Sequence, residues 1–129
     1  MNNKTLKLVA LIAFALPIFA HAEVALNDNS EILGKWNVYA EATKLDGEKK
    51  AIMVEWDFKA DGTLQTKATD SRGRTKEMKI AIKYAVENGE IKKQTKPGQE
   101  KYETCKVVEK EASNMVLKCQ FLYYFLSKI

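Results

Sequence analysis

Hydrophobic residues recur at every second position along most of this chain. The pattern is clearest over residues 76–87, where charged residues and alanines separate five apolar side chains: Met78, Ile80, Ile82, Tyr84 and Val86. A helix would scatter these side chains around its surface, whereas a strand places all of them on one face. The pattern therefore predicts a strand with one face toward a core.

The same alternation predicts further strands joined by tight turns. The expected strands cover residues 35–45, 51–59, 63–69, 76–87, 90–95, 101–109 and 115–126, after a short helical turn over residues 30–33. Turn sequences lie between most of them: Asp46-Gly47, Asp61-Gly62, Ser71-Arg72-Gly73, Asn88-Gly89 and Pro97-Gly98. Because such short connections cannot join parallel strands, the pairing should be antiparallel and sequential. The chain is therefore predicted to be all-β, a small antiparallel up-and-down β-barrel of seven or eight strands.

The first 22 residues have the three parts of a secretory signal peptide. Lys4 and Lys7 precede an apolar stretch over residues 8–19, and Ala20-His21-Ala22 is a typical cleavage site. The apolar stretch is too short to span a bilayer, so cleavage is favoured over a membrane anchor. We therefore expect a soluble barrel domain of residues 23–129, periplasmic or secreted, with no membrane span after signal cleavage.

The mature chain lacks the residues that many enzymes and metal sites need. Its one histidine, His21, lies in the predicted signal, which argues against histidine-activated nucleophiles and imidazole metal sites. Without Lys4 and Lys7, 19 of the 21 Lys and Arg residues remain, against 17 Asp and Glu. These positive and negative charges are too evenly balanced for a nucleic-acid-binding protein. No phosphate-binding or calcium-binding loop is present. The sequence thus predicts a protein that is not an enzyme and holds no cofactor and no metal.

The expected inward-facing side chains are numerous and large. They are Trp36, Val38, Ile52, Val54, Trp56, Phe58, Leu64, Ile80, Ile82, Tyr84, Val86, Phe121 and Tyr123. An eight-stranded barrel can be filled by such side chains or can hold one small ligand, and a mostly filled interior is favoured here. A small pocket near the open end would use Trp56, Phe58, Tyr84 and Tyr123, with the two tyrosines offering hydroxyls.

Residues 121–126 are apolar on both faces of the expected last strand. Either the N-terminal segment covers the outer residues Leu122, Tyr124 and Leu126, or these three form an interface with a protein partner. Both interpretations remain open. A basic edge made by Lys92, Lys93 and Lys96 is interpreted as a solvated turn.

Cys105 and Cys119 are the only cysteines of the chain. With Glu111-Ala112-Ser113 as a hairpin loop, Lys110 faces Asn114, Val107 faces Leu117, and Cys105 faces Cys119. An even number of cysteines in an exported chain favours a structural disulfide. Free thiols or a redox couple are the alternatives, and a redox couple usually has closer spacing and a helix N-terminus.

Three short motifs lie along the predicted strands: Gly34-x-Trp36 after the helical turn, Trp56-x-Phe58-x-x-Asp61-Gly62-Thr63-Leu64, and Tyr84-x-Val86-x-x-Gly89. Together they resemble the small bacterial lipocalin-like domains. The resemblance covers residues 30–129 and implies that Trp36 packs across the closed end of the barrel as a structural residue. The arginine that usually stacks on this tryptophan is missing, and Lys128 is at best its substitute. The chain is also shorter than the larger lipocalins, which argues against a large ligand cup.

The resemblance implies a binding protein, with a small apolar molecule in or at the mouth of the barrel. The alternative is a periplasmic inhibitor or immunity-type protein that binds a protein partner through loops or through Leu122, Tyr124 and Leu126. An enzyme comes third, because without histidine it would depend on tyrosine, lysine and carboxylate chemistry alone.

Overall fold

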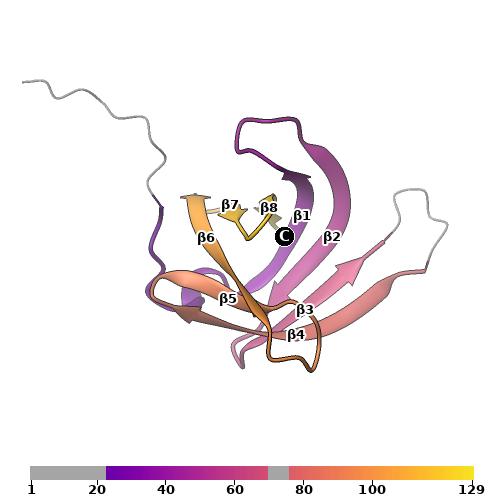
Figure 1. Cartoon of the computed structure of the whole chain (residues 1–129), viewed down its shortest axis with the longest axis vertical. Coiled ribbons are helices and arrows are strands. Elements are labelled where there is room, and N and C mark those ends of the chain that lie inside the picture. The colour runs from indigo at the N-terminus through magenta and orange to yellow at the C-terminus, as the bar shows by residue number, and fades with distance from the viewer. Residues whose placement is uncertain (1–22, 70–75) are drawn as a thin grey trace, which may run out of the picture.

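The computed structural model describes residues 23–69 and 76–129, which form a closed eight-stranded antiparallel barrel (Figure 1). A short 3₁₀ helix, η1 (Asn29–Glu31), precedes the strands. The strands are β1 (Gly34–Ala42), β2 (Lys50–Phe58), β3 (Thr63–Ala68), β4 (Met78–Glu87), β5 (Glu90–Gln94), β6 (Tyr102–Lys110), β7 (Asn114–Lys118) and β8 (Tyr123–Lys128). Each strand pairs with the next, and β8 closes on β1. The predicted all-β barrel is confirmed, while the signal peptide and the turn at residues 71–73 lie outside the described residues.

The stretch expected as one last strand over residues 115–126 is two strands, β7 and β8, separated by a turn. The Cys119 N–H donates to the Leu122 carbonyl at 2.9 Å and closes this turn. Its sequence, Cys-Gln-Phe-Leu, contains no glycine, proline or asparagine, so the usual turn signals are missing. The prediction of a single strand here is wrong for that reason.

The missed turn reverses which residues of β8 face the interior. Leu117 of β7 pairs with Tyr124, and residues directly opposite each other share a face. Tyr124 and Leu126 therefore belong to the main core, whereas Tyr123 packs with Phe125 in a second cluster. Phe121, expected to face inward, is 79% exposed.

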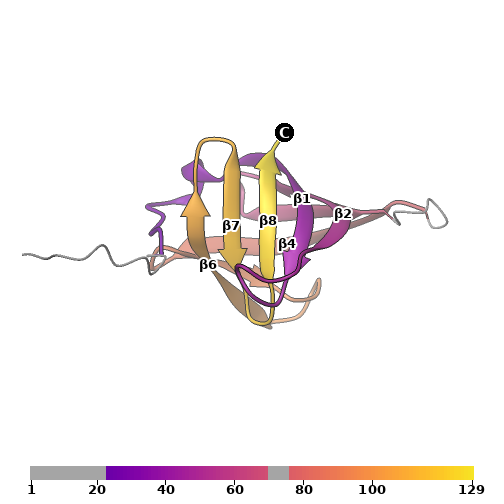
Figure 2. The same cartoon turned by 90° about the horizontal axis from the view of Figure 1, so that it is seen from above.

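Strands β6, β7, β8 and β1 form one wall of the barrel (Figure 2). The second cluster lies on the outer face of this wall, because its residues alternate with those of the main core. Its buried members are Ala40, Ala42, Val108, Val116 and Phe125. A bulge between Val38 and Ala40 shifts the alternation of β1 and brings Ala40 and Ala42 to that face. Val116 and Phe125 face outward by regular alternation, because their neighbours Leu117 and Tyr124 face the core. Leu45 of the β1–β2 loop packs on the cluster, and Lys49 Nζ lies 4.3 Å from the Phe125 ring centroid. This loop, not the N-terminal segment, covers the outer side of β8.

The N-terminal segment instead covers one end of the barrel, which we name the closed end. The Val24 N–H donates to the Val107 carbonyl at 2.7 Å, and the Leu26 N–H donates to the Gly89 carbonyl at 3.0 Å. Trp36 is 1% exposed there, and its indole N–H donates to the Ile32 carbonyl at 2.9 Å. The described structure therefore gives Trp36 a packing role at this end.

Lys128 takes the position beside Trp36 that the resemblance assigned to an arginine. Its Nζ lies 4.8 Å from the Trp36 ring centroid and donates to the Leu33 carbonyl. Gly34 leaves room for this side chain, because a Cβ at Gly34 would lie 2.7 Å from Lys128 Nζ. Gly34 also has a φ of 104°, a conformation that other residues rarely adopt.

Gly34→Ala is expected to lower the free energy of unfolding by about 1–3 kcal/mol, because it strains the backbone and displaces Lys128. Gly98→Ala is the matched control, since Gly98 also has positive φ, 74°, but has nothing within 4 Å of its would-be Cβ. Urea unfolding of both variants measures the difference. An equal loss for the two variants would show that the Lys128 contact contributes nothing.

Candidate functional site

The inward-facing apolar side chains become more exposed toward the end of the barrel opposite Trp36, which we name the open end. Along β2, Phe58 is 1% exposed and Trp56 6%, whereas Val54 and Ile52 are only half-buried. Along β4, Ile82 is 8% exposed and Ile80 is again half-buried. All of these side chains pack on one core cluster. The open end therefore presents apolar surface that is continuous with the core and in contact with solvent.

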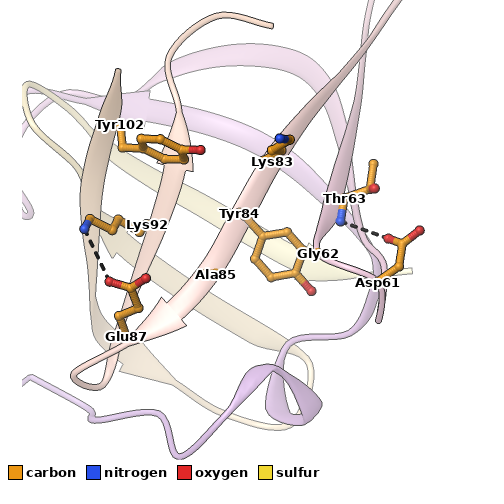
Figure 3. Close-up of a pocket in the computed structure, with 9 residues that line it drawn as sticks. All are labelled: Asp61, Gly62, Thr63, Lys83, Tyr84, Ala85, Glu87, Lys92 and Tyr102. Atoms are coloured by element: carbon orange, nitrogen blue, oxygen red, sulfur yellow. Dashed lines mark hydrogen bonds and ion pairs between the residues drawn. The ribbon is translucent and has the colours of Figure 1, made fainter. Parts of the chain in front are cut away.

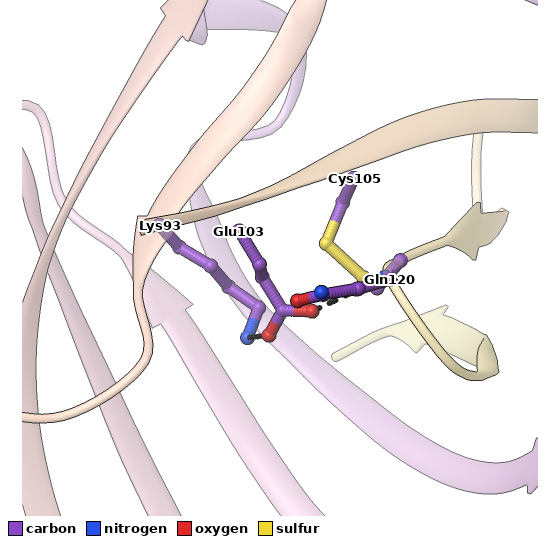
Figure 4. Close-up of a disulfide and its surroundings, with 5 residues drawn as sticks. Lys93, Glu103, Cys105 and Gln120 are labelled. Carbon is purple, nitrogen blue, oxygen red and sulfur yellow. Dashed lines mark hydrogen bonds and ion pairs between the residues drawn. A yellow bond between two sulfur atoms is a disulfide. The ribbon is translucent and has the colours of Figure 1, made fainter. Parts of the chain in front are cut away.

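A largely buried ion pair lies in the interior next to this apolar surface. Lys93 of β5 and Glu103 of β6 are cross-strand neighbours, and their Nζ and Oε2 atoms are 2.7 Å apart. Their side chains are only 10% and 16% exposed. The second carboxylate oxygen of Glu103 accepts the Gln120 N–H at 3.3 Å (Figure 4). The interpretation of Lys93 as part of a solvated edge is wrong, although Lys92 is exposed as expected.

Trp56 links the ion pair to the aromatic side chains of the interior. Lys93 Nζ lies 5.4 Å from its ring centroid, and the ring centroid of Tyr124 lies 5.4 Å away on β8. Burial raises the pKa of the Tyr124 hydroxyl, and the carboxylates of Glu103 and Glu41 raise it further. The hydroxyl therefore stays protonated and can donate. This group combines aromatic faces with an ammonium, a carboxylate and a phenol.

Three of the four predicted ligand-contacting residues lie together. The Phe58 ring is 6.1 Å from Trp56 and 5.0 Å from Tyr84. The Tyr84 hydroxyl, however, belongs to the closed end, where it donates to the Lys59 carbonyl at 2.7 Å and accepts from the Asn29 side chain at 3.3 Å. Burial raises its pKa as well. Tyr123 faces outward, so the expectation that both tyrosine hydroxyls lie at the open end is wrong.

The predicted interface of Leu122, Tyr124 and Leu126 does not form an outer patch. Leu126 is 1% exposed in the main core, and Tyr124 packs against the same core from inside the barrel. Leu122 is half-buried in the β7–β8 turn. The missed turn explains this difference, because it places alternate residues of β8 inward.

Sequence reasoning missed Lys93, Glu103 and Tyr124 as interior residues. A signal for the first two was present: Lys93 is two residues from the apolar Ile91, and Glu103 is two residues from Cys105. Continuing the period of two through these charged residues would have placed both inside. Because both residues are charged, they were instead expected to face solvent.

Cys105 and Cys119 form the predicted disulfide across β6 and the end of β7 (Figure 4). Val107 faces Leu117, as expected, but the bulge in β6 places Lys110 opposite Met115 instead of Asn114. In the described part of the chain, Glu103 and these two cysteines are the one group with metal-ligand spacing. Because both sulfurs are bonded to each other, they are not available as thiolate ligands.

A hollow of about 530 Å³ lies on the outer face of the barrel (Figure 3). It is lined by Asp61, Gly62, Thr63, Lys83, Tyr84, Ala85, Glu87, Lys92 and Tyr102. Lys92 and Glu87 form an ion pair at 3.3 Å along its wall. This hollow is separate from the interior ion pair, because the outward-facing Lys83, Ala85 and Lys92 line it.

The closed eight-stranded barrel, with its tryptophan at the closed end, defines a lipocalin-like fold. The structure is similar to that of a lipocalin-like protein from Bacteroides uniformis, with a TM-score of 0.63 and 18% identity over 78% of this chain and 100% of that one. It is also similar to an uncharacterized protein from Bacteroides eggerthii, with a TM-score of 0.60 and 15% identity over 75% of this chain and 98% of that one. At these identities the similarity shows the fold alone.

No protein-family model and no curated protein matches the sequence. Across the described residues, we find no helix with the length and apolar character needed to cross a membrane.

Proposed function

We propose that this chain is an exported, non-catalytic binding protein that takes a small apolar molecule at the open end of its barrel. The observation that carries the proposal is the half-buried apolar surface made by Ile52, Val54 and Ile80. Apolar side chains that face inward yet stay in contact with solvent can bury further area against a ligand, and binding sites are commonly lined in this way.

The polar groups beside this surface would orient the ligand. The Lys93 ammonium, paired with Glu103, and the Tyr124 ring both lie next to Trp56, so an apolar molecule with one polar end fits the arrangement best. Few polar groups among many apolar ones give a site its orientation and specificity.

Export to the periplasm is the second part of the proposal. It rests on the signal-like residues 1–22 and on the buried Cys105–Cys119 disulfide, a bond that persists in oxidising compartments. The absence of histidine from residues 23–129 supports a binding role over a catalytic one.

Ile52→Gln is expected to weaken binding of the neutral apolar dye N-phenyl-1-naphthylamine about tenfold, because it replaces apolar surface at the open end with an amide. Met53→Gln is the matched control, since Met53 is the next residue of β2, faces outward and is 52% exposed. Fluorescence titration of the folded domain measures both affinities. Equal weakening in the two variants, or no dye binding by the unmodified domain, would contradict the proposal.

A further inference from the structure

Strand β4 has two halves with different neighbours. Residues 78–83 pair with β3, and only residues 84–87 pair with β5. Beyond this point β5 ends at Gln94, and the following residues lead away into the loop before β6. The first half of β4 therefore has a neighbouring strand on one side only.

Two hydrogen bonds show which backbone groups of β4 point toward β3 and which point away from it. The Tyr84 N–H donates to the Gly62 carbonyl on the β3 side, at 2.9 Å. The Lys83 N–H points the other way and donates to the Gln94 side-chain oxygen at 2.8 Å. Because backbone groups alternate in direction along an antiparallel strand, the N–H and C=O groups of Lys79 and Ala81 also point away from β3. Among the described residues, no backbone group pairs with them.

Gln94 marks the point where the barrel wall separates. It is 3% exposed, and its amide nitrogen donates to the Gln99 carbonyl at 3.0 Å. The outer hollow begins at the same point, with Lys83 on one side and Tyr102 of β6 on the other (Figure 3). The hollow lies over residues 83–87 of β4, and the unpaired edge begins where the hollow ends, at residues 79–82.

We propose that the free edge of β4, residues 79–83, binds an extended acidic segment of another protein as an added strand. Main-chain hydrogen bonds from Lys79 and Ala81 would supply affinity, as in other cases of strand addition. The outward side chains of this edge are Lys79, Ala81 and Lys83, all exposed, so acidic residues of the partner would lie opposite lysines. The neighbouring hollow, with the 39% exposed Tyr102, would receive the next partner side chain.

Charge argues against a second copy of this chain as the occupant. Two β4 edges paired antiparallel about Ala81 would place Lys79 of each copy opposite Lys83 of the other. Like charges directly opposite each other destabilise a strand pair. Lysines on an exposed edge are also a known protection against self-association. The edge therefore selects a partner of opposite charge.

Amide hydrogen exchange followed by NMR tests the proposal. The probes are an acetylated and amidated heptapeptide alternating glutamate with valine, and the same peptide with lysine in place of glutamate. The glutamate peptide at millimolar concentration should slow exchange at Lys79 and Ala81 about tenfold, because both amides gain partners. The lysine peptide should leave them unchanged.

Two variants separate strand addition from nonspecific attraction. Ala81→Pro removes one free N–H without removing a bond to β3, and it should abolish protection at Lys79. The double change Lys79→Glu and Lys83→Glu should reverse the preference, so that the lysine peptide protects the edge. Lys44→Glu with Lys50→Glu is the matched control, because it changes the net charge equally at exposed positions of the β1–β2 region.

Four results would overturn the proposal. They are the absence of protection by the glutamate peptide, protection that appears away from β4, equal protection by both peptides, and dimer formation through β4 without peptide. If Ala81→Pro fails to fold, the charge-reversal variant decides alone. Dye binding at the open end is expected to stay unchanged in every variant that folds, so the two sites can fail separately.

Discussion

Lys93→Met is expected to lower the free energy of unfolding by about 3–5 kcal/mol. The change removes the ammonium that pairs with Glu103 at 2.7 Å and leaves a carboxylate that is only 16% exposed. A charge left buried without its partner keeps its full desolvation cost. Urea unfolding of the variant and of the unmodified domain measures the loss.

The double variant Lys93→Met with Glu103→Leu is expected to recover most of that loss, because apolar replacement of a buried pair is often neutral or stabilising. Lys92→Met is the control: its pair with Glu87 lies in solvent, so the loss should stay below about 1 kcal/mol. If Lys93→Met costs no more than Lys92→Met, the pair is effectively solvated. A stable double variant would instead mean that folding does not require the pair, which supports a role in binding.

Removing the disulfide through Cys105→Ala with Cys119→Ala is expected to lower the free energy of unfolding by about 3 kcal/mol. The bond joins residues 14 positions apart, and its loss frees this loop in the unfolded chain. For a barrel of this size such a loss is a large share of the total stability. Urea unfolding gives the value.

The chemically reduced, unmodified domain is the control for the cysteine variant, because it keeps both sulfur atoms in the core. A similar loss in the two samples assigns the effect to the covalent bond, whereas a loss in the alanine variant alone assigns it to packing. A change below about 1 kcal/mol in both would contradict a stabilising role for the bond.

Local pattern was enough to predict most of the strands and part of their register. Alternation over residues 76–87 predicted β4, and the hairpin loop assigned to residues 111–113 placed Val107 opposite Leu117 and Cys105 opposite Cys119. The Gly34-x-Trp36 motif pointed to the tryptophan at the closed end. These features depend on neighbours within one strand or one hairpin, where sequence distance and spatial distance are closely related.

Errors arose where the phase of alternation changed without a sequence signal. The turn before Tyr123 carries no typical turn residue, and it reversed the inward side of β8. The bulge after Val38 breaks the alternation that begins at Trp36, so Ala40 and Ala42 pack in the outer cluster covered by Leu45. A one-residue change in phase moves every later side chain to the other face of the sheet.

The sequence by itself determined the strand class and the disulfide, because each follows from residue type and short-range spacing. The tertiary structure decided which charges are buried and where the barrel wall opens. From its charge, Lys93 is expected at the surface, but closure of the barrel places it against Trp56 and Glu103. The free edge of β4 likewise exists only because β5 ends early. The position along β4 at which β5 ends depends on how all the strands pair in the closed barrel.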